Sequence, residues 1–256
     1  MLTRELLLKL SKRFPKKYAK WNHDRVGLMS GKLPYEVHKI FLCLDFDHEL
    51  YDVVKKEMPN LILTHHPFIY GTRAKVLKYD PVKRNIVEKI EALNIPIYSI
   101  HTNFDTGRGG MNDALSEALG LKEIKIIEKD IMMRGGKLPQ PMDVKEFAKY
   151  ANKCFNVDYS LLINKGKKVV ESVAIIGGGG SRRWSIAKDA GYDIFISGDA
   201  PHYVRRDIVL NNYNYLDMPH EIEKIFMPQM KKILLEIDPT LQILTVDHEK
   251  LPEVIM

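Results

Sequence analysis

A short apolar run over residues 60–64 ends in two adjacent histidines and a proline, His65-His66-Pro67. The run is typical of a buried strand, and Pro67 prevents a helix from continuing through it. The two imidazoles therefore lie at the carboxyl end of a strand, where open α/β sheets place their ligands. This feature limits the chain to folds in which a buried strand presents polar chemistry at one edge of a sheet.

A second strand-like run, residues 96–101, repeats the arrangement: it ends in His101, and Asp105 follows shortly after. Imidazole and carboxylate are common ligands of divalent metal ions. Adjacent side chains of a regular strand point to opposite faces. His65 and His66 can therefore serve one centre only if the backbone turns at Pro67, unless they serve two neighbouring ions. The structural alternatives are one buried and one exposed histidine, and a hydrogen-bonded structural role for His101.

A third group, His220 with Glu221 and Glu223, begins a predicted helix directly after a strand. His220 and Glu223 are three residues apart, so they share a helix face if the helix has started there. That face offers one nitrogen and one oxygen to an ion. The alternative is a charged helix N-terminus, where carboxylates suit the helix dipole.

Two further segments are open to two interpretations. The loop Gly177–Gly180 with Arg182 and Arg183 joins a strand to a helix, so it could cradle a phosphate or simply form a tight βα turn. Asp199 and His202 follow another strand and could face the same cleft as the other polar groups.

The alternation of strands and helices predicts an α/β protein with two lobes, residues 1–126 and 127–256, and βα units on a largely parallel sheet. A turn-rich connector is expected over 134–142. The predicted helices cover 2–20, 48–57, 81–93, 111–119, 143–154, 181–190 and a final segment to 236. The predicted strands cover 39–46, 60–64, 96–101, 122–128, 130–133, 159–164, 169–176, 193–197, 213–216 and 242–246.

Composition narrows the class of protein. Hydrophobic residues make up 45% of the 256 residues, which is enough for a core. The net charge of +6 is spread along the chain, so it permits contact with nucleic acid without requiring it. We expect two reduced cysteines, no signal peptide and no membrane span, hence a cytoplasmic protein.

Several of these motifs together resemble the Nif-three-like family, also known as GTP cyclohydrolase 1 type 2 homologues. The double histidine and the His101-Thr102-Asn103-Phe104-Asp105 segment are the most specific matches. The other matching segments are 21–28, 110–113, 134–136, 177–180, 197–199 with His202, and 217–220.

The resemblance implies two α/β lobes around a cleft that holds a dinuclear metal centre. It implies that His65, His66 and Asp105 are ligands, and that His220 completes the site from the segment beginning near residue 217. The family has a glutamate four residues after the last histidine, but Lys224 stands there in this chain. We expect Glu223 to replace it, with Glu221 as the competitor. The resemblance also implies a homohexamer.

The expected function is that of a metal-dependent hydrolase acting on a nucleotide or another small phosphoester. Two divalent ions, Zn, Fe, Mn, Co or Ni, would activate water. His101 would act as a general base or orient a ligand. The alternative is a metal-binding or nucleic-acid-binding assembly protein without turnover.

Overall fold

The structure is a computed structural model that describes residues 1–21, 23–127 and 129–255. It divides into two compact units, which are Met1–Gly107 with Phe226–His248, and Arg108–Ile225 with Glu249–Met256. The second unit thus begins at Arg108, ahead of the boundary expected near 126, and the segment 226–248 belongs to the first unit. Asn22 in the loop matched to the family, and Glu128 at the end of a predicted strand, lie outside the described residues.

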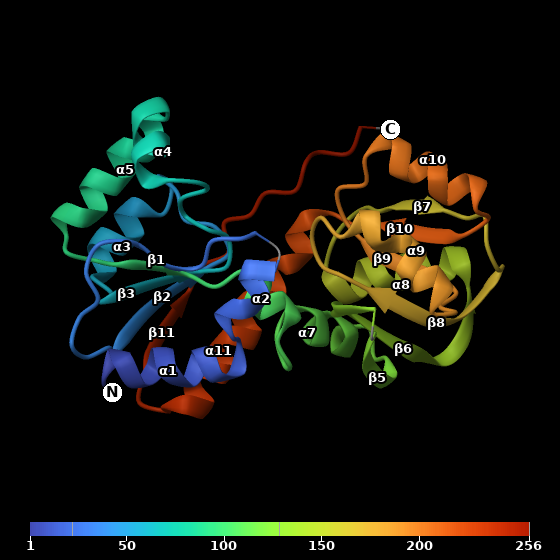
Figure 1. Ribbon diagram of the computed structural model, residues 1–256, viewed down its shortest axis with the longest axis horizontal. Helices are drawn as coiled ribbons and strands as arrows, with labels where there is room; N and C mark the ends of the chain where they lie inside the picture. The colour runs from blue at the N-terminus through green and yellow to red at the C-terminus, as the bar shows by residue number, and fades with distance from the viewer. Residues whose placement is uncertain (22, 128, 256) are drawn as a thin grey trace. The chain divides into compact units, whose positions relative to one another are not determined.

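The first unit contains a five-stranded sheet with the order β1-β4-β3-β2-β11 (Figure 1). β2, β3, β4 and β11 are parallel, as the sequence predicted, while the short strand β1 pairs antiparallel with β4 and was not predicted. The parallel strands bring their carboxyl ends to one edge, so the residues after β2, β3 and β4 meet there. The strands are β1 (Gly27–Ser30), β2 (Lys39–Cys43), β3 (Leu61–Thr64), β4 (Ile97–Ser99) and β11 (Gln242–Thr245).

Helices accompany this sheet and differ from the prediction at three places, one of which is the short helix α6 over Thr102–Thr106, a segment to which no helix was assigned. The helix expected over 2–20 is interrupted at Phe14 and Pro15, because proline lacks the N–H that a helix interior needs. A further helix, α4, lies in the segment expected to be a loop and begins at a Thr72 cap. The helices are α1 (Thr3–Arg13), α2 (Lys16–Trp21), α3 (Tyr51–Glu57), α4 (Arg73–Tyr79), α5 (Pro81–Ala92), α6 (Thr102–Thr106) and α11 (Phe226–Ile237).

The core of the first unit lies between the sheet and α5. Ile86, Val87 and Ile90 recur on one face of α5 and are all buried with Phe41 and Ile62 of the sheet. The apolar face predicted for this amphipathic helix also included Val82, which is instead exposed at the first turn. Burying the rest of this face fixes the strands whose ends carry the polar residues discussed below.

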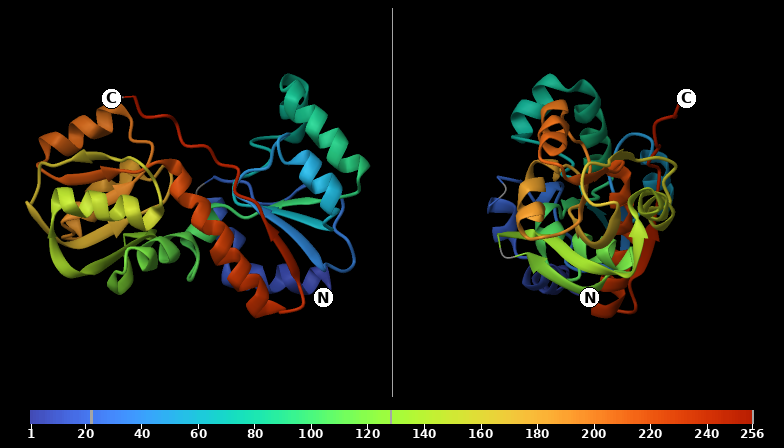
Figure 2. Two further views of the ribbon diagram at one scale, coloured as in Figure 1. Left: turned by 180° about the vertical axis from the view of Figure 1, so that it is seen from behind. Right: turned by 90° about the vertical axis from the view of Figure 1, so that its right-hand side faces the viewer.

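The second unit contains a six-stranded mixed sheet with the order β5-β6-β8-β9-β10-β7. Figure 2 shows it from two further sides. β8, β9 and β10 are parallel, and the outer strands are antiparallel to their neighbours. The strands are β5 (Lys122–Ile127), β6 (Asp130–Asp143), β7 (Leu161–Ile163), β8 (Val169–Ile175), β9 (Ile194–Ser197) and β10 (Asn214–Asp217).

The turn-rich connector predicted over 134–142 is wrong, because these residues belong to the long strand β6. Its two prolines, Pro139 and Pro141, fall within the register shift between Lys137 and Met142. Proline is tolerated at such an irregularity because no ladder hydrogen bond is required of it. The glycine Gly135 leaves room for the Tyr192 ring, with which a Cβ atom would collide.

The helices of the second unit flank this sheet and follow the prediction more closely. The exceptions are two short 3₁₀ segments, η1 and η2, which precede α9 and α11. None of the described helices in either unit is both long and apolar enough to cross a bilayer. The segments are α7 (Met111–Ala118), α8 (Val144–Phe155), η1 (Ser181–Arg183), α9 (Trp184–Asp189), α10 (His202–Leu210) and η2 (His220–Ile225).

Candidate metal centre

The two adjacent histidines lie side by side just after β3. The strand ends at Thr64, whose hydroxyl donates to the carbonyl of His66 over 2.8 Å. The chain has left the regular pleat at this point, so the two rings do not point to opposite faces. The ring centroids of His65 and His66 are 5.0 Å apart. This local turn brings the two imidazoles to the same side of the chain, which is required if both are to serve one metal centre.

Each of these histidines has an oxygen acceptor beside its Nδ1 atom. His65 Nδ1 lies 3.0 Å from the carbonyl oxygen of Ile100, and His66 Nδ1 lies 2.6 Å from Asp45 Oδ2. An Nδ1–H that donates to oxygen leaves the lone pair on Nε2. The protein therefore fixes the tautomer in which Nε2 of both rings can bind a metal ion.

His101 follows β4 and is held in the same way. Its Nδ1 lies 2.8 Å from Asp24 Oδ2, which also accepts from the Thr102 hydroxyl over 2.7 Å. Burial of Asp24 disfavours its charge, but the hydrogen bond and positive charge of His101, together with Thr102, lower the pKa of this carboxyl below its usual range. Ring nitrogens of His65, His66 and His101 lie within 4.8 Å of one another.

Asp105 adds a buried carboxylate to this group. It lies on the short helix α6, is 6% exposed, and places Oδ1 3.4 Å from His65 Nε2. The neighbouring Asn103 fixes the helix start, since its amide accepts from the His101 backbone N–H and donates to the Phe14 carbonyl. Asn103 thus fixes the loop between β4 and α6.

An apolar wall closes one side of His65. The rings of Phe104 and Phe226 lie 5.1 Å apart, and each packs on the His65 ring. Aromatic neighbours exclude water from that side of the imidazole. The three histidines and Asp105 thus offer imidazole nitrogen and carboxylate oxygen as metal ligands, beside an apolar wall that excludes water.

The second unit holds His220 and Glu223 together in η2. His220 Nε2 lies 3.1 Å from Glu223 Oε2, and His220 Nδ1 lies 2.6 Å from Asp199 Oδ2. Glu223 is 3% exposed. Burial alone would lower the pKa of His220, but the hydrogen bonds and charges of Asp199 and Glu223 raise it to about 11.

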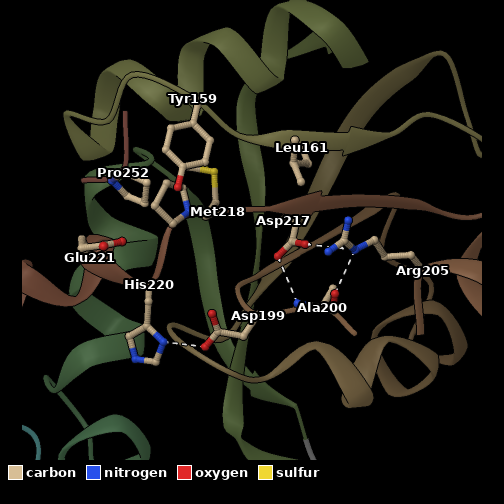
Figure 3. A pocket seen from close by; sticks show the side chains of 11 residues that line it. Tyr159, Leu161, Asp199, Ala200, Arg205, Asp217, Met218, His220, Glu221 and Pro252 are labelled. Atoms are coloured by element: carbon tan, nitrogen blue, oxygen red, sulfur yellow. Dashed lines mark hydrogen bonds and ion pairs between the residues drawn. The ribbon is translucent and has the colours of Figure 1, made fainter. Parts of the chain in front are cut away.

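The two alternative positions for the last ligand, Lys224 and Glu221, do not share the contact that Glu223 makes with His220. Lys224, where the resemblance places a glutamate, directs its amine to the carbonyl of Asn156 over 3.2 Å. Glu221 lines a surface pocket with His220, Asp199 and Asp217 (Figure 3). Glu223 is therefore the carboxylate that contacts the Nε2 atom of His220.

The glycine loop 177–180 packs against this pair. Gly178 has a φ of +59°, and a Cβ atom there would collide with Glu223 Oε1 and lie 3.1 Å from His220 Nε2. The two arginines that follow are engaged elsewhere: Arg182 donates to the Tyr203 hydroxyl, and Arg183 pairs with Asp130. The contacts are those of a tight turn beside Glu223.

Among the described residues, His202 joins none of the groups whose side chains could hold an ion. It is exposed at the first turn of α10. Asp199, its predicted companion, is instead the acceptor for His220 Nδ1.

The sequence did not single out Asp24 or Asp45 as functional residues. Asp45 follows β2, so the rule that parallel strands end at one edge was a usable signal for it. Asp24 lies in a polar loop and is 77 positions from His101, so no local pattern links the two.

The donor set suits a metal ion of borderline softness. Imidazole nitrogen with carboxylate oxygen is the combination that Zn, Fe, Mn, Co and Ni accept in proteins. Acceptors behind the Nδ1 atoms are the usual support of metal-binding histidines. The residues present therefore fit a divalent metal ion.

Comparison with known proteins places the chain in a family. The sequence pattern of the family described as Duf34/NIF3 (NGG1p interacting factor 3) matches residues 1–252. A protein of Clostridium perfringens named GTP cyclohydrolase 1 type 2 homolog is 31% identical over 203 residues, which cover 77% of each chain.

Solved structures share the fold. A Bacillus cereus protein related to NIF3 superimposes with a TM-score of 0.89 at 20% identity, covering 100% of this chain and 99% of its own. Reduced HcgD from Methanocaldococcus jannaschii has a TM-score of 0.79 at 24% identity, covering 96% and 98%. The match over nearly the whole sequence decides the assignment: the chain belongs to the Duf34/NIF3 family.

Proposed function

We propose that this protein is a metal-dependent hydrolase acting on a nucleotide or a small phosphoester. The proposal assigns two divalent ions to one dinuclear centre, as the family resemblance implies. The ligands assigned to it are His65, His66, Asp105, His220 and Glu223. Metal identity is left open among Zn, Fe, Mn, Co and Ni.

The observation that carries the proposal is a shared arrangement of four histidines. His65, His66, His101 and His220 each have an oxygen beside Nδ1, at 3.0, 2.6, 2.8 and 2.6 Å. Structural histidines have no reason to share an oxygen beside Nδ1, whereas metal-binding or proton-transferring histidines use such an oxygen to orient Nε2. Carboxylates beside Nε2 of His65 and His220 supply the oxygen donors.

In the proposed reaction, residues around the metal ligands would transfer a proton, orient a ligand and exclude water. His101 would accept a proton at Nε2 while Asp24 stabilises the resulting imidazolium through Nδ1. Asp45 would hold His66 in its binding orientation. Phe104 and Phe226 would exclude water from one side of His65. When bound, divalent ions would polarise the electrophile and lower the pKa of water.

The choice of substrate class draws on the relatives. The Clostridium perfringens relative carries a name that refers to GTP. GTP is therefore the first substrate to test, with a generic phosphodiester as the second, because paired metal ions suit many phosphoesters.

The test is turnover by metal-loaded protein with and without chelator. We expect chelator-sensitive hydrolysis that is lost in His65→Ala and kept in His48→Ala, since His48 is exposed in the same unit. Absence of turnover on both substrates, together with salt-sensitive DNA binding, would favour the non-catalytic alternative.

A further inference from the structure

The second unit contains a hollow of about 290 Å³ beside His220. It lies at the carboxyl ends of the parallel strands β9 and β10, which end at Ser197 and Asp217. Open α/β sheets bind ligands at this edge. The volume is close to the lower limit of small-molecule sites. The position and size are those of a ligand site rather than of a packing defect.

One side of the hollow is apolar. Tyr159, Met218 and Pro252 gather there, with Leu161 farther along the same side (Figure 3), and Pro219 also lines the hollow. Met218 and Pro219 are buried, so this wall is anchored in the body of the unit. An aromatic ring next to prolines offers a surface for a flat or alkyl group and favours cations over anions.

The other sides are acidic. Asp199, Asp217 and Glu221 line the hollow together with two positively charged side chains, Arg205 and His220. Arg205 lies 3.6 Å from Asp217, and His220 Nδ1 lies 2.6 Å from Asp199 Oδ2, so each of these cations is paired with one carboxylate. Among the described residues, Glu221 is therefore the lining carboxylate that no lining cation offsets.

The electrostatic influence of these carboxylates reaches the apolar wall. Burial raises the pKa of the Tyr159 hydroxyl, and the charges of Glu221 and Asp217 raise it further. Burial likewise raises the pKa of Asp217, and Asp199 adds to the rise, although the Ala200 N–H and Arg205 oppose it. A bound cation would relieve this repulsion.

The spacing of the carboxylates argues against a bare metal ion. Among the described residues, no group of potential ligands within 4.8 Å of one another contains Asp199, Asp217 or Glu221. One small ion cannot reach them together. A larger molecule can contact separate carboxylates and lay its carbon skeleton on Tyr159.

We propose that this hollow binds a small organic cation, an amidine, guanidine or amine joined to an apolar body, through Glu221 with Tyr159 as the apolar support. The site shares His220 with the proposed metal centre.

The test uses benzamidine as the probe and benzamide as its neutral counterpart. Binding to the metal-free full chain is followed by titration calorimetry or by NMR. We expect saturable binding of benzamidine at least about tenfold tighter than that of benzamide. Glu221→Gln and Tyr159→Ala are each expected to weaken it by roughly threefold or more. Added salt is expected to weaken it too.

Glu171→Gln is the matched control, because Glu171 is exposed on β8 of the same unit and does not line the hollow. It is expected to leave benzamidine binding unchanged. Equal binding of the two probes, or unchanged affinity in both Glu221→Gln and Tyr159→Ala, would overturn the proposal. Thermal melting of each variant checks that it is folded.

Metal content of the same preparations separates this proposal from the proposed function. If the Glu221→Gln variant loses affinity for benzamidine but binds metal like the wild type, Glu221 belongs to the cation site and is not a metal ligand. Wild-type protein that binds benzamidine but no metal would contradict the proposed function and leave the cation site standing. Wild-type protein that binds metal but not benzamidine would contradict the cation site alone.

Discussion

Asp24 Oδ2 lies 2.8 Å from His101 Nδ1, so a loop residue orients a histidine that follows a distant strand. Asp24→Asn keeps the shape but removes the charge and disturbs the tautomer. We expect activity to fall roughly tenfold to a hundredfold.

A purely structural role for Asp24 would leave the activity unchanged after correction for the folded fraction. The control is Asp52→Asn, an exposed aspartate on α3 of the same unit. The nitrogen NMR shifts of the His101 ring provide the second readout because they report its tautomer, and unchanged shifts in Asp24→Asn would contradict the assignment.

Asp45 supports His66 through a 2.6 Å contact to Nδ1. Asp45→Asn should lower metal affinity by roughly tenfold to a hundredfold without unfolding the protein, since the carboxylate is partly exposed. Competition with a chromophoric chelator measures the affinity. Unchanged affinity would show that His66 needs no support from Asp45.

Gly178 and Gly191 form a matched pair of left-handed glycines, with φ of +59° and +84°. Gly191 faces open space, so Gly191→Ala should cost only the backbone strain of about 1 kcal/mol. Gly178→Ala should cost more, because its Cβ would collide with Glu223, and it should also weaken metal binding. Urea unfolding and metal titration give the two readouts; equal effects of the two substitutions would contradict this account.

Asp193 links stability to pH. Burial disfavours its charge, but Lys167, the backbone N–H groups of Glu171 and Ser172, and the Ser172 hydroxyl together lower its pKa in the folded protein. A carboxyl with a lowered folded pKa stabilises the protein above its unfolded pKa of about 3.9. That contribution disappears as the pH falls through the folded pKa.

Asp193→Asn should therefore lower the free energy of unfolding at pH 7 by about 1–3 kcal/mol through lost hydrogen bonds. The difference from wild type should shrink as the pH is lowered below 3.9. Urea titrations at several pH values measure both. A difference that stays constant with pH would show that the Asp193 charge contributes nothing.

The sequence predicted those parts of the fold that have a local signature. The β3 strand and its histidines were predicted because a buried apolar run and Pro67 occur together. The α5 helix was predicted from an apolar face of Val82, Ile86, Val87 and Ile90, of which the last three are buried. The α4 helix was missed because none of its residues is buried, so it has no stripe to detect.

Other features depend on contacts between distant segments. The β6 strand contains glycines and prolines that are typical of a turn, and only its pairing with β5 and β8 holds it extended. The turn that brings the His65 and His66 rings together depends on hydrogen bonds of Thr64. Asp24 could not be connected to His101 from the sequence, since the pairing exists only after the loop folds onto α6.

Metal content per chain tests the central claim most directly. After reconstitution and removal of loosely bound metal, elemental analysis should find about two ions per wild-type chain. His48→Ala should retain both, and His65→Ala should lose at least one. Fewer than one ion per wild-type chain, or an unchanged content in His65→Ala, would contradict the account.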